Sequence, residues 1–567
     1  MELEFCNIVD KRILANFLGI EYKELTYILY AKKTDNLYQS FEIPKKNGGL
    51  RCINAPMEPL KRVQRNLAKR LLIVQEKHYI NNNAIVHGFT RKRSIISNGR
   101  RHRNKCYVLN LDLEDFFDSF HFGRVKGYFQ KNKYFQLSED VSACLANIAC
   151  YKGKLPQGSP SSPVITNLIC SILDRRIALI AKKYHLDYTR YADDLTFSTN
   201  DKKFLENVES LLSELYSEIE KSGFKVNQSK TRISFCDSRQ EVTGLVVNEK
   251  ISVKREFYKQ TRSMLDYMYK GLPIKCNDVE ISQQQLEGRL AFINQIDKYN
   301  NNDRKNHKTI HNGMNAREKQ YQKFLFYKHF YQPDKPVIVT EGKTDIVYIR
   351  SALQKYYLNY PQLINKKEDG SFEYKVSFLN RTCRSNPEKI TKLEFFLGIQ
   401  KDGASAMKNI YNFYTGKNGY PNLVAFFSEK YKITPINPVI LLFDNENDTA
   451  TKSKRPLQEF LNYIGRREAL GSNLGFHIQD NLYLVTIPLV KGKPECEIED
   501  LFPDEVLNHE IDGKKFDRKG KDSEKSYGKH VFSLYIAKNL NDIDFEGFIP
   551  LIETISKIVS EYKVTRT

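Results

Sequence analysis

Two stretches of β-forming residues in the first half of the chain carry acids. Residues 107–120 (YVLNLDLEDFFDSF) have the pattern of an apolar strand in which Asp112 follows a run of β-formers. Residues 186–199 (LDYTRYADDLTFST) contain two β-rich stretches flanking Asp193 and Asp194, the composition of a hairpin with both acids at its turn. An acid that leaves a buried run needs a partner, so these segments mark a first candidate site.

Other segments have the patterns of helices and buried strands. Residues 154–177 open with a Pro/Gly/Ser turn and continue as an apolar helix, and 255–297 have helical spacing. In the second half, 335–353 and 437–450 each contain a five-residue buried strand that ends in acids. The predicted fold class is therefore multidomain, an α+β part followed by an α/β part.

A chain of 567 residues exceeds what one hydrophobic core usually fills. Residues 298–320 are rich in Asn and Lys and contain almost no large apolar residue, which indicates a linker. We therefore predict a first domain at 1–300, a connector at 301–334 and a second domain at 335–567 that ends in a helical extension.

The charge is concentrated in the first half. The chain has 89 Lys and Arg against 68 Asp and Glu, a net charge of +21. Residues 1–334 carry 55 basic and 37 acidic side chains, whereas 335–567 carry 34 and 31. Residues 51–110 alone have 14 Lys or Arg and two acids. A basic surface of this kind suits a nucleic-acid partner, and it belongs to the first half.

The sequence predicts a cytoplasmic protein. No apolar run approaches the roughly 20 residues that a bilayer span needs, so we expect no membrane partner. The amino terminus lacks a basic and then apolar leader. The ten cysteines are scattered without a CxxC pair, which favours reduced thiols over disulfides or a zinc site.

The acids of the first site suggest a divalent metal. Adjacent carboxylates at a turn repel each other unless a cation neutralises them. Mg²⁺ suits hard oxygen ligands and keeps substrate phosphates in its remaining positions. Taken alone, an Asp-Asp turn is more often simply exposed to solvent, so the neighbouring motifs decide the interpretation.

Those motifs resemble reverse transcriptases. LDLEDFF, QGSPSSP, YADD, KVNQSKT and VTGL occur in family order at family spacing over about residues 20–300. The resemblance implies a right-hand polymerase with fingers, palm and a helical thumb. Val242-Thr243-Gly244 resembles the retron type, as does the stretch from Asn98 to His102, although it has Gly where that family has Ala. Group II intron polymerases share most of the other motifs and remain the alternative.

The resemblance also implies a role for each residue at the first site. Two Mg²⁺ ions would be held by Asp112, the Leu113 carbonyl, Asp193 and Asp194. Lys230 would donate a proton to the leaving pyrophosphate. Phe117 would pack under the sugar and reject a 2′-hydroxyl. The other expected contacts to the deoxynucleoside triphosphate are Arg51, Lys45, Gln157 and Gly158. The expected RNA contacts are Asn98, His102, Val242, Thr243 and Gly244.

A second set of acids follows strands in the second half. Glu341 ends the strand of 335–353, and Asp444, Glu446 and Asp448 follow the strand of 437–450. Open α/β sheets place ligand sites at the carboxyl ends of their strands. Three acids spaced two apart can cradle a divalent metal, and they are equally typical of a polar loop after a strand. Both interpretations stay open from this pattern alone.

The two segments together resemble a TOPRIM domain, a Rossmann-like metal-binding fold, over about residues 335–540. Glu341-Gly342 matches one motif, and Asp444-Asn445-Glu446 matches the other with Glu in place of its second Asp. The Glu-Gly-x-Thr-Asp spelling resembles the nuclease branch, of the overcoming-lysogenization-defect type. In that branch Glu499 and Lys529 would complete a catalytic site for Mg²⁺ or Mn²⁺, in which Glu341, Asp444, Glu446, Asp448 and Glu499 are metal ligands.

The resemblances imply a retron reverse transcriptase fused to a TOPRIM nuclease-like effector in antiphage defence. Such an enzyme copies its own structured noncoding RNA into single-stranded DNA that stays attached to it. Assembly of several copies, through nucleic acid or the C-terminal domain, is left open. The alternative is an intron-like polymerase whose second half is a non-catalytic nucleic-acid-binding or assembly module.

Overall fold

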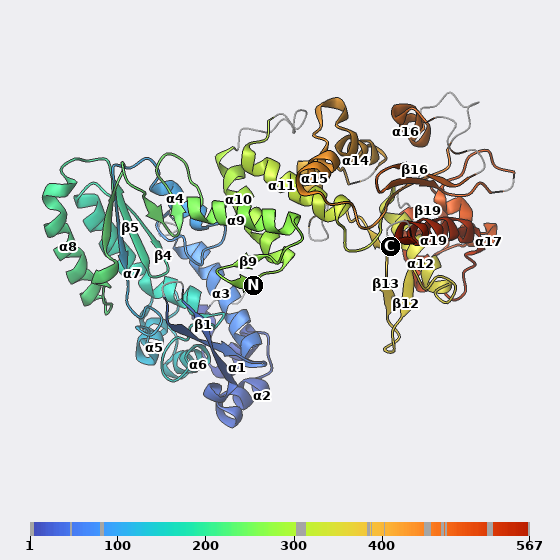
Figure 1. Cartoon of the computed structure of the whole chain (residues 1–567). Coiled ribbons are helices and arrows are strands. Elements are labelled where there is room, and N and C mark those ends of the chain that lie inside the picture. Colours follow the sequence, from blue (N-terminus) through green and yellow to red (C-terminus); the bar gives the residue numbers. More distant parts are fainter. Residues whose placement is uncertain are drawn as a thin grey trace. The chain divides into compact units, whose positions relative to one another are not determined.

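The computed structural model divides the chain into two compact units. It describes all residues except 1–4, 46–47, 80–83, 302–312, 383–385, 387, 402, 447–454, 467–469, 471–472, 491, 519–524 and 565–567. One unit comprises residues 1–259 and 295–302, and the other comprises 260–294 and 303–567 (Figure 1). Part of the predicted linker, 302–312, lies outside the described residues.

A four-stranded antiparallel sheet forms the centre of the first unit. Its order is β4-β5-β3-β6, with β3 at Tyr107–Asp112, β4 at Asp187–Tyr191, β5 at Asp194–Thr199 and β6 at Arg232–Phe235. The predicted strand and hairpin are therefore present. Their alternating side chains bury Leu109, Leu111, Leu195 and Phe197 in the core.

Helices pack against this sheet and complete its core. The bounds of the helices are α3 Leu60–His78, α4 Ile95–Arg101, α5 Phe122–Lys131, α6 Glu139–Ala149, α7 Ser162–Lys183 and α8 Phe204–Lys221. The predicted apolar helix is α7, which begins with Pro163 in its first turn and is buried along most of its length. The amino-terminal region adds α1 Lys11–Phe17, α2 Tyr22–Thr26 and a hairpin of β1 Tyr38–Pro44 with β2 Leu50–Pro56. These amino-terminal elements share one apolar core with the sheet and its helices, as expected of an α+β domain.

A buried ion pair fixes the β4–β5 hairpin to α7. Arg190 of β4 donates from Nε to Asp174 Oδ1 (2.7 Å) and from its terminal NH₂ group to Asp174 Oδ2 (2.8 Å). Both side chains are fully buried. Arg190 also donates to the Ala192 carbonyl (3.1 Å), which lies within the turn that carries Asp193 and Asp194. The orientation of that turn therefore depends on a charge pair inside the protein.

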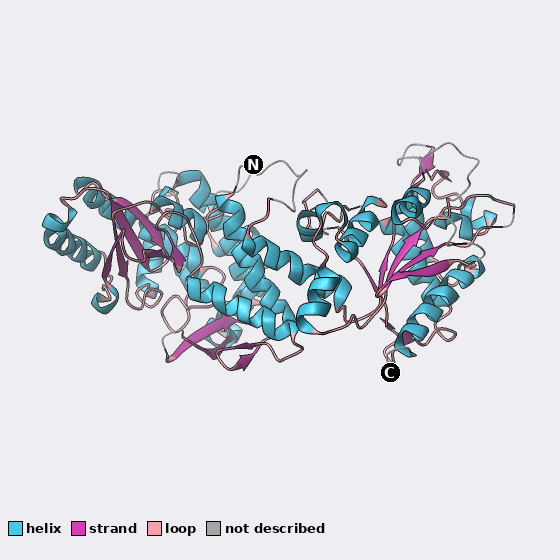
Figure 2. Ribbon diagram, turned by 45° about the horizontal axis from the view of Figure 1, so that its top comes forward, coloured by secondary structure: helices cyan, strands magenta, loops and turns pink. Residues whose placement is uncertain are grey.

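The second unit is built on a five-stranded α/β sheet. Its order is β14-β11-β15-β17-β16, with four parallel strands and an antiparallel edge strand, β16 (Figure 2). The strand bounds are β11 Val337–Val339, β14 Ser377–Phe378, β15 Val439–Phe443, β16 Gly475–Gln479 and β17 Leu482–Thr486. The surrounding helices include α12 Lys343–Lys355, α14 Ser405–Thr415, α15 Leu423–Tyr431, α16 Pro456–Ile464, α18 Lys529–Lys538 and α19 Ile549–Val564. The predicted alternation of strand and helix is present, although β11 has three residues where five were expected.

The predicted thumb helices are α9 Arg255–Tyr269 and α10 Gln283–Asn300. A short hairpin of β9 (Lys275–Cys276) and β10 (Val279–Glu280) lies between them in the chain. Most of both helices packs with the second unit. The ring of Tyr269 is fully buried and lies 4.9–5.3 Å from those of Tyr327, Phe427 and Tyr431. Tyr431 also donates to Asp266 (3.0 Å). The compact units therefore divide inside these helices, while the domain boundaries predicted at 300 and 335 remain predictions.

Within the described parts of the chain, no helix is both long and apolar enough to cross a membrane.

The Arg190–Asp174 pair gives a test of what fixes the hairpin. Asp174→Asn leaves a buried guanidinium without its counter-charge, and we expect it to destabilise the first unit by about 3–5 kcal/mol. Glu218→Gln is the control, because it breaks the pair between Arg176 of α7 and Glu218 of α8 (2.7 Å), in which Arg176 is 52 % exposed. Such a pair contributes about 0–1 kcal/mol. Hydrogen exchange of β4 and β5 measures both effects, and equal losses would contradict the proposed role.

Candidate functional site

Three aspartates converge where β3 meets the β4–β5 turn. Asp112 ends β3 and is paired in register with Asp194, the first residue of β5. Asp193 precedes it in the turn, and its carbonyl accepts the Leu113 N–H (3.1 Å). The acids lie 81 and 82 positions apart in the sequence and are brought together only by the antiparallel pairing of β3 with β5.

The turn has little freedom to move. Ala192 has φ of 56°, in the left-handed region. Behind it lies Gly88, where a Cβ would be 2.7 Å from the Ala192 backbone nitrogen. The Gly88 carbonyl in turn accepts from Asn167 of α7 (2.9 Å). Glycine at 88 is therefore required by the close approach of the turn, and it keeps Asp193 in place.

Lys230 provides the nearest cation. Its Nζ lies 2.8 Å from Asp112 Oδ2, and this hydrogen bond raises the pKa of the lysine. The short helix that carries it, η5 (Gln228–Lys230), is attached to β3 through a bond from the Asn227 N–H to the Asp112 carbonyl (2.8 Å). The KVNQSKT motif thus brings its lysine to the first aspartate, as the resemblance implied.

Burial and mutual repulsion perturb the paired acids. Burial, followed by the charges of Asp193 and Asp112, raises the pKa of Asp194 to about 7. Burial also raises the pKa of Asp193, which Lys230 and Arg51 partly oppose. Such a site favours a bound cation, because the cation would relieve the repulsion.

The expected nucleotide contacts surround the β1–β2 hairpin and the QGSP turn. Gly158 has φ of 126°, and a Cβ there would be 2.7 Å from the Asn54 carbonyl, so only glycine fits. The Asn54 N–H bonds the Gln157 carbonyl (2.8 Å), which joins the turn to β2. Arg51 is exposed on the same strand, and Lys45 lies exposed in the loop of the hairpin.

Phe117 is partly buried, five positions after Asp112, and packs against the core of the first unit. Its ring contacts that of Phe116 at 5.5 Å and faces Phe89 at 6.4 Å. Phe89 is itself 41 % exposed. The position is compatible with the expected steric role against a 2′-hydroxyl, which stays a prediction.

Three of the expected RNA contacts are in the interior. Asn98, His102 and Val242 are all fully buried. His102 bonds Ser198 Oγ (2.8 Å) and Thr189 Oγ1 (2.7 Å), and burial lowers its pKa to about 3. The prediction that these side chains contact RNA is therefore corrected. Asn98 and His102 form a hydrogen-bonded network with Thr189 and Ser198 beneath the surface, and Val242 packs with Val108 and Val247.

Thr243 and Gly244 form the turn that this network supports. They connect β7 (Glu241–Val242) to β8 (Leu245–Val246) and have φ of 46° and 81°. Positive φ at both central residues is typical of a two-residue hairpin turn whose twist matches that of the flanking strands. Thr243 is β-branched and strained in this region. Asn98 donates to its Oγ1 (3.5 Å). Gly244 is exposed, so the turn itself remains available for RNA.

A second group of acids lies at the carboxyl ends of β11 and β15. Glu341 follows β11 and accepts the Asp444 N–H at its Oε1 (3.2 Å). Asp444 follows β15 and accepts the Ile498 N–H (3.0 Å). Burial, followed by neighbouring acids, raises the pKa of Glu341 to about 7 and that of Asp444 well above its usual range. The predicted convergence of these two acids is therefore present.

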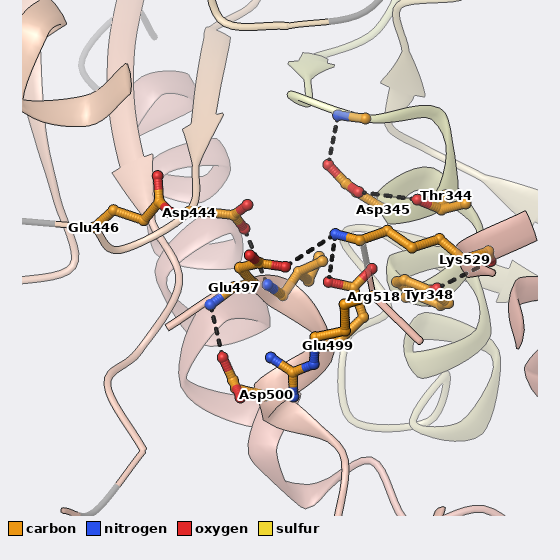
Figure 3. A network of polar contacts seen from close by, with 12 residues as sticks. Thr344, Asp345, Tyr348, Asp444, Glu446, Glu497, Glu499, Asp500, Arg518 and Lys529 are labelled. Carbon is orange, nitrogen blue, oxygen red and sulfur yellow. Dashed lines mark hydrogen bonds and ion pairs between the residues drawn. The ribbon is translucent and has the colours of Figure 1, made fainter. Parts of the chain in front are cut away.

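Lys529 enters this group from the start of α18. Its Nζ lies 3.1 Å from Glu497 and 3.0 Å from Glu499, as Figure 3 shows. Glu499 is fully buried, and its Oε1 accepts no hydrogen bond from the described residues. The carboxylates on both sides raise the pKa of the lysine against the effect of burial. The prediction that Glu499 and Lys529 belong together is thus realised in the geometry.

Two further acids of the group were not among the predicted site residues. Asp345 accepts the Gly342 N–H (2.8 Å), is nearly buried, and has its pKa raised by burial. The Glu-Gly-x-Thr-Asp motif could have pointed to Asp345, because the Asp at its fifth position caps the start of α12. Glu497 shares Lys529 with Glu499, and only its neighbourhood in PECEIEDLFP pointed to it.

Glu446 has an ion-pair partner of its own, although its charge also helps to raise the pKa of Glu341. It pairs with Arg455 (3.1 Å), which also pairs with Glu495 (2.9 Å). Asp448, the third predicted acid of that loop, lies outside the described residues.

The arrangement of the acids bears on the metal ions predicted at both sites. Among the residues that the structure describes, no three Asp, Glu, His or Cys side chains are arranged to hold a metal ion. The donors still suit Mg²⁺, because all are hard oxygens, and burial followed by neighbouring acids raises the pKa of Asp194 and of Glu341, which a bound cation would oppose. At the first site, Asp112 would have to exchange Lys230 for the ion.

Comparison with known proteins identifies the first half. A family model for reverse transcriptase (RNA-dependent DNA polymerase) matches residues 43–267. Retron Mx162 reverse transcriptase of Myxococcus xanthus is 35% identical over 321 residues, 50% of this chain and 63% of that protein. Retron Ec86 reverse transcriptase of Escherichia coli is 34% identical over 307 residues, 54% of this chain and 88% of that protein. This chain belongs to the retron reverse transcriptase family.

Membership in this family confirms the polymerase fold of the first half. Reverse transcriptase domains generally use Mg²⁺. The chain spans 61% of a third relative, Retron Mx65 reverse transcriptase of Myxococcus xanthus, at 35% identity. A telomerase structure from Candida albicans has a TM-score of 0.30 at 14% identity, covering 51% of this chain and 60% of that one, which is too low to carry an argument. These relatives cover about half of the chain, and the TOPRIM resemblance remains a prediction.

The raised pKa of Asp194 predicts how the stability of the metal-free protein changes with pH. Because folding raises the pKa of Asp194 from near 4 to about 7, its contribution is present below pH 4 and lost as the pH rises through 7. Asp194→Asn removes this loss. In EDTA at pH 8 we expect the variant to exceed wild type by roughly 1–3 kcal/mol in local stability, and to match it near pH 4.

Hydrogen exchange of β3 and β5 across this pH range measures the effect. The control is Asp118→Asn, which removes an exposed carboxylate of the same unit. A difference between Asp194→Asn and wild type that stays constant with pH would contradict the assignment.

Proposed function

We propose that the first half of this chain is an RNA-directed DNA polymerase. The observation that carries this proposal is the register of β3 with β5, which brings Asp112 opposite Asp194 with Lys230 in contact. The family membership supports it independently. The substrates would be deoxynucleoside triphosphates and a primer paired with an RNA template.

The residues of the palm and fingers divide the chemistry between them. Bound Mg²⁺ would neutralise the triphosphate and lower the pKa of the primer hydroxyl, and Asp112, Asp193, Asp194 and the Leu113 carbonyl are the oxygens available to hold it. Arg51 and Lys45 are exposed cations that suit the triphosphate. Lys230, once released from Asp112, is a protonated acid within reach of the leaving pyrophosphate.

The finer proposal is retron function, in which the enzyme primes within its own structured RNA and leaves single-stranded DNA attached to it. The Thr243-Gly244 turn, supported from below by Asn98, offers an exposed surface for that RNA. The rival is an intron-type polymerase. Sequencing the RNA that copurifies with the protein separates the two, because a compact RNA with branched DNA favours the retron and a self-splicing intron favours the rival.

The palm acids give the direct test of polymerisation. Asp193→Asn with Asp194→Asn removes two carboxylates that would hold the metals, and we expect primer extension on an RNA template to fall at least about 10³-fold. Lys230→Ala should lose about 10²–10⁴-fold, as expected for a general acid, with Lys230→Arg in between. Glu341→Gln, in the other unit, is the control. Extension by the double variant at the wild-type rate would overturn the proposal.

The acid group of the second unit supports a second candidate function, metal-dependent phosphodiester hydrolysis by a TOPRIM-like effector. Four carboxylates with raised pKa values meet at the ends of two parallel strands. The buried Oε1 of Glu499 and the Glu341 carboxylate are oxygens that suit Mg²⁺ or Mn²⁺. When bound, the metal would activate water and stabilise the leaving oxygen.

In an antiphage retron, the RNA and its attached DNA would restrain this effector until infection disturbs them. The rival is a non-catalytic module in which the acids only stabilise the fold. Comparing the toxicity of wild type with that of Glu341→Ala under forced activation separates the two. If the module is non-catalytic, the substitution should leave toxicity unchanged. Loss of protection in the Asp193→Asn/Asp194→Asn variant would support the coupling of DNA synthesis to defence.

Metal binding at the second site can be measured without knowing its substrate. We expect millimolar Mn²⁺ or Mg²⁺ to raise the thermal midpoint of the second unit, because the ion relieves repulsion among the buried acids. Glu341→Gln should remove most of this rise. Glu505→Gln, an exposed change of the same charge, should leave it intact. An equal rise in wild type and Glu341→Gln would exclude Glu341 as a ligand.

A further inference from the structure

The first unit contains a large basic and aromatic cavity that the polymerase chemistry does not use. It has a volume of about 1080 Å³ and lies among the end of α3, α5 with the turn after it, α7 and the end of α8. The palm aspartates, Lys230 and the expected nucleotide contacts are not among its lining residues. Its volume exceeds the range of roughly 300–1,000 Å³ that small-molecule sites occupy.

The lining is strongly one-sided in charge. None of the lining residues is acidic, whereas six are cations: Arg124, Lys131, Lys133, Arg175, Arg176 and Lys221. Arg176 is partly neutralised by Glu218 (2.7 Å). Lys131, Arg175 and Lys221 are exposed. A concave surface lined by one sign of charge concentrates ligands of the opposite sign, here anionic ones.

One cation is fixed in place by the backbone. Arg124 donates to the carbonyls of Ser222 (2.8 Å) and Ser119 (3.2 Å), and its guanidinium lies over the ring of Phe224 at 4.3 Å. Because several partners hold this side chain, it loses little freedom when an anion binds. A fixed guanidinium is a localised positive charge that attracts a phosphate group.

Aromatic rings form an ordered wall beside these cations. The ring of His78 is stacked on that of Tyr134 at 4.2 Å with an interplanar angle of 19°. The hydroxyl of Tyr79 bonds that of Tyr128 (2.8 Å) and accepts from Asn132 (3.1 Å). Lys133 lies 4.8 Å from the centre of the Tyr134 ring. The rings are thus held by stacking and hydrogen bonds before any ligand arrives.

We propose that this cavity binds a single-stranded segment of nucleic acid, at a site separate from the primer and template in the palm. Cations that track a phosphate backbone, together with aromatic faces on which bases stack, are the features that single strands require. The rings also pack against the core of the unit, and their partly buried sides line the cavity, where a strand can contact them and a simple anion cannot. This site goes beyond the proposed polymerase function and does not depend on it.

The test is the salt dependence of binding to labelled 12-nucleotide U and dT strands. The site variant is Lys131→Gln/Lys221→Gln. The control is Lys202→Gln/Lys203→Gln, an equal charge loss at the other end of α8, about 27 Å away along an 18-residue helix. Each phosphate contact on a single strand contributes about 0.7 to the slope of log K against log salt. We expect the site variant to lose about 1.4 of slope and three- to tenfold in affinity, and the control to keep both.

Photo-crosslinking locates the bound strand. With 4-thiouridine in the RNA or 4-thiothymidine in the DNA, we expect crosslinks to the peptides that carry Tyr79, Tyr128 and Tyr134, and their loss in the site variant. The two arms show whether the cavity takes RNA, DNA or both. Lys131→Arg/Lys221→Arg should restore the slope, which separates lost charge from misfolding, and extension of a short primer confirms that each variant is folded.

Three results would overturn the proposal. The first is an equal salt slope in the site and control variants. The second is crosslinking only to other peptides. The third is a change of slope in the site variant with duplexes but not with single strands. None of these results would bear on the palm aspartates, so failure here is distinguishable from failure of the polymerase proposal.

Discussion

Both candidate sites depend on carboxylates held together at strand ends with little water around them. In the palm, antiparallel pairing sets Asp112 opposite Asp194, and in the second unit parallel strands end side by side at Glu341 and Asp444. The repulsion and burial raise the pKa of Asp194 and of Glu341 to about 7. Ionising such carboxyl groups costs free energy, so each site favours a nearby positive charge. The arrangement of the strands is what brings the carboxyl groups together.

A lysine provides part of that charge at each site, but the two lysines are held differently. Lys230 makes a single contact to Asp112, and its side chain is 56% exposed. Lys529 contacts Glu497 and Glu499 together and is 34% exposed, with Glu499 fully buried. A single exposed ion pair is weak, whereas breaking a buried pair leaves an uncompensated charge. The Lys230–Asp112 contact is therefore the easier of the two to break, as the proposed role of Lys230 requires, while Lys529 is held by two carboxylates.

Local patterns and motif order were enough to predict much of both sites from the sequence. The strands bearing Asp112, Asp193 and Asp194, the helix after QGSP, and the meeting of Glu341 with Asp444 could all be predicted from β-forming runs and their terminal acids. Burial across elements could not be predicted in this way. The motif residues Asn98 and His102 lie beneath the turn that was expected to contact RNA, and the Arg190–Asp174 pair joins two elements that no periodic pattern connects. These contacts arise only when α4, α7 and the hairpin pack together.

Packing also explains why the boundary that the sequence indicates is not where the compact units divide. The Asn-rich stretch near residue 300 has the composition of a linker. Before it, α9 nonetheless buries Met268 and Tyr269, and α10 buries Leu286 and Leu290, in the same core as Phe427. Glu287 of α10 is further bridged by Lys328 and Lys392, which hold its pKa below the usual range despite burial. Composition reports where a chain is solvated, whereas a compact unit is defined by shared apolar contacts. The helices expected to form the thumb are therefore stabilised by apolar contacts within the compact unit that carries the second acidic site.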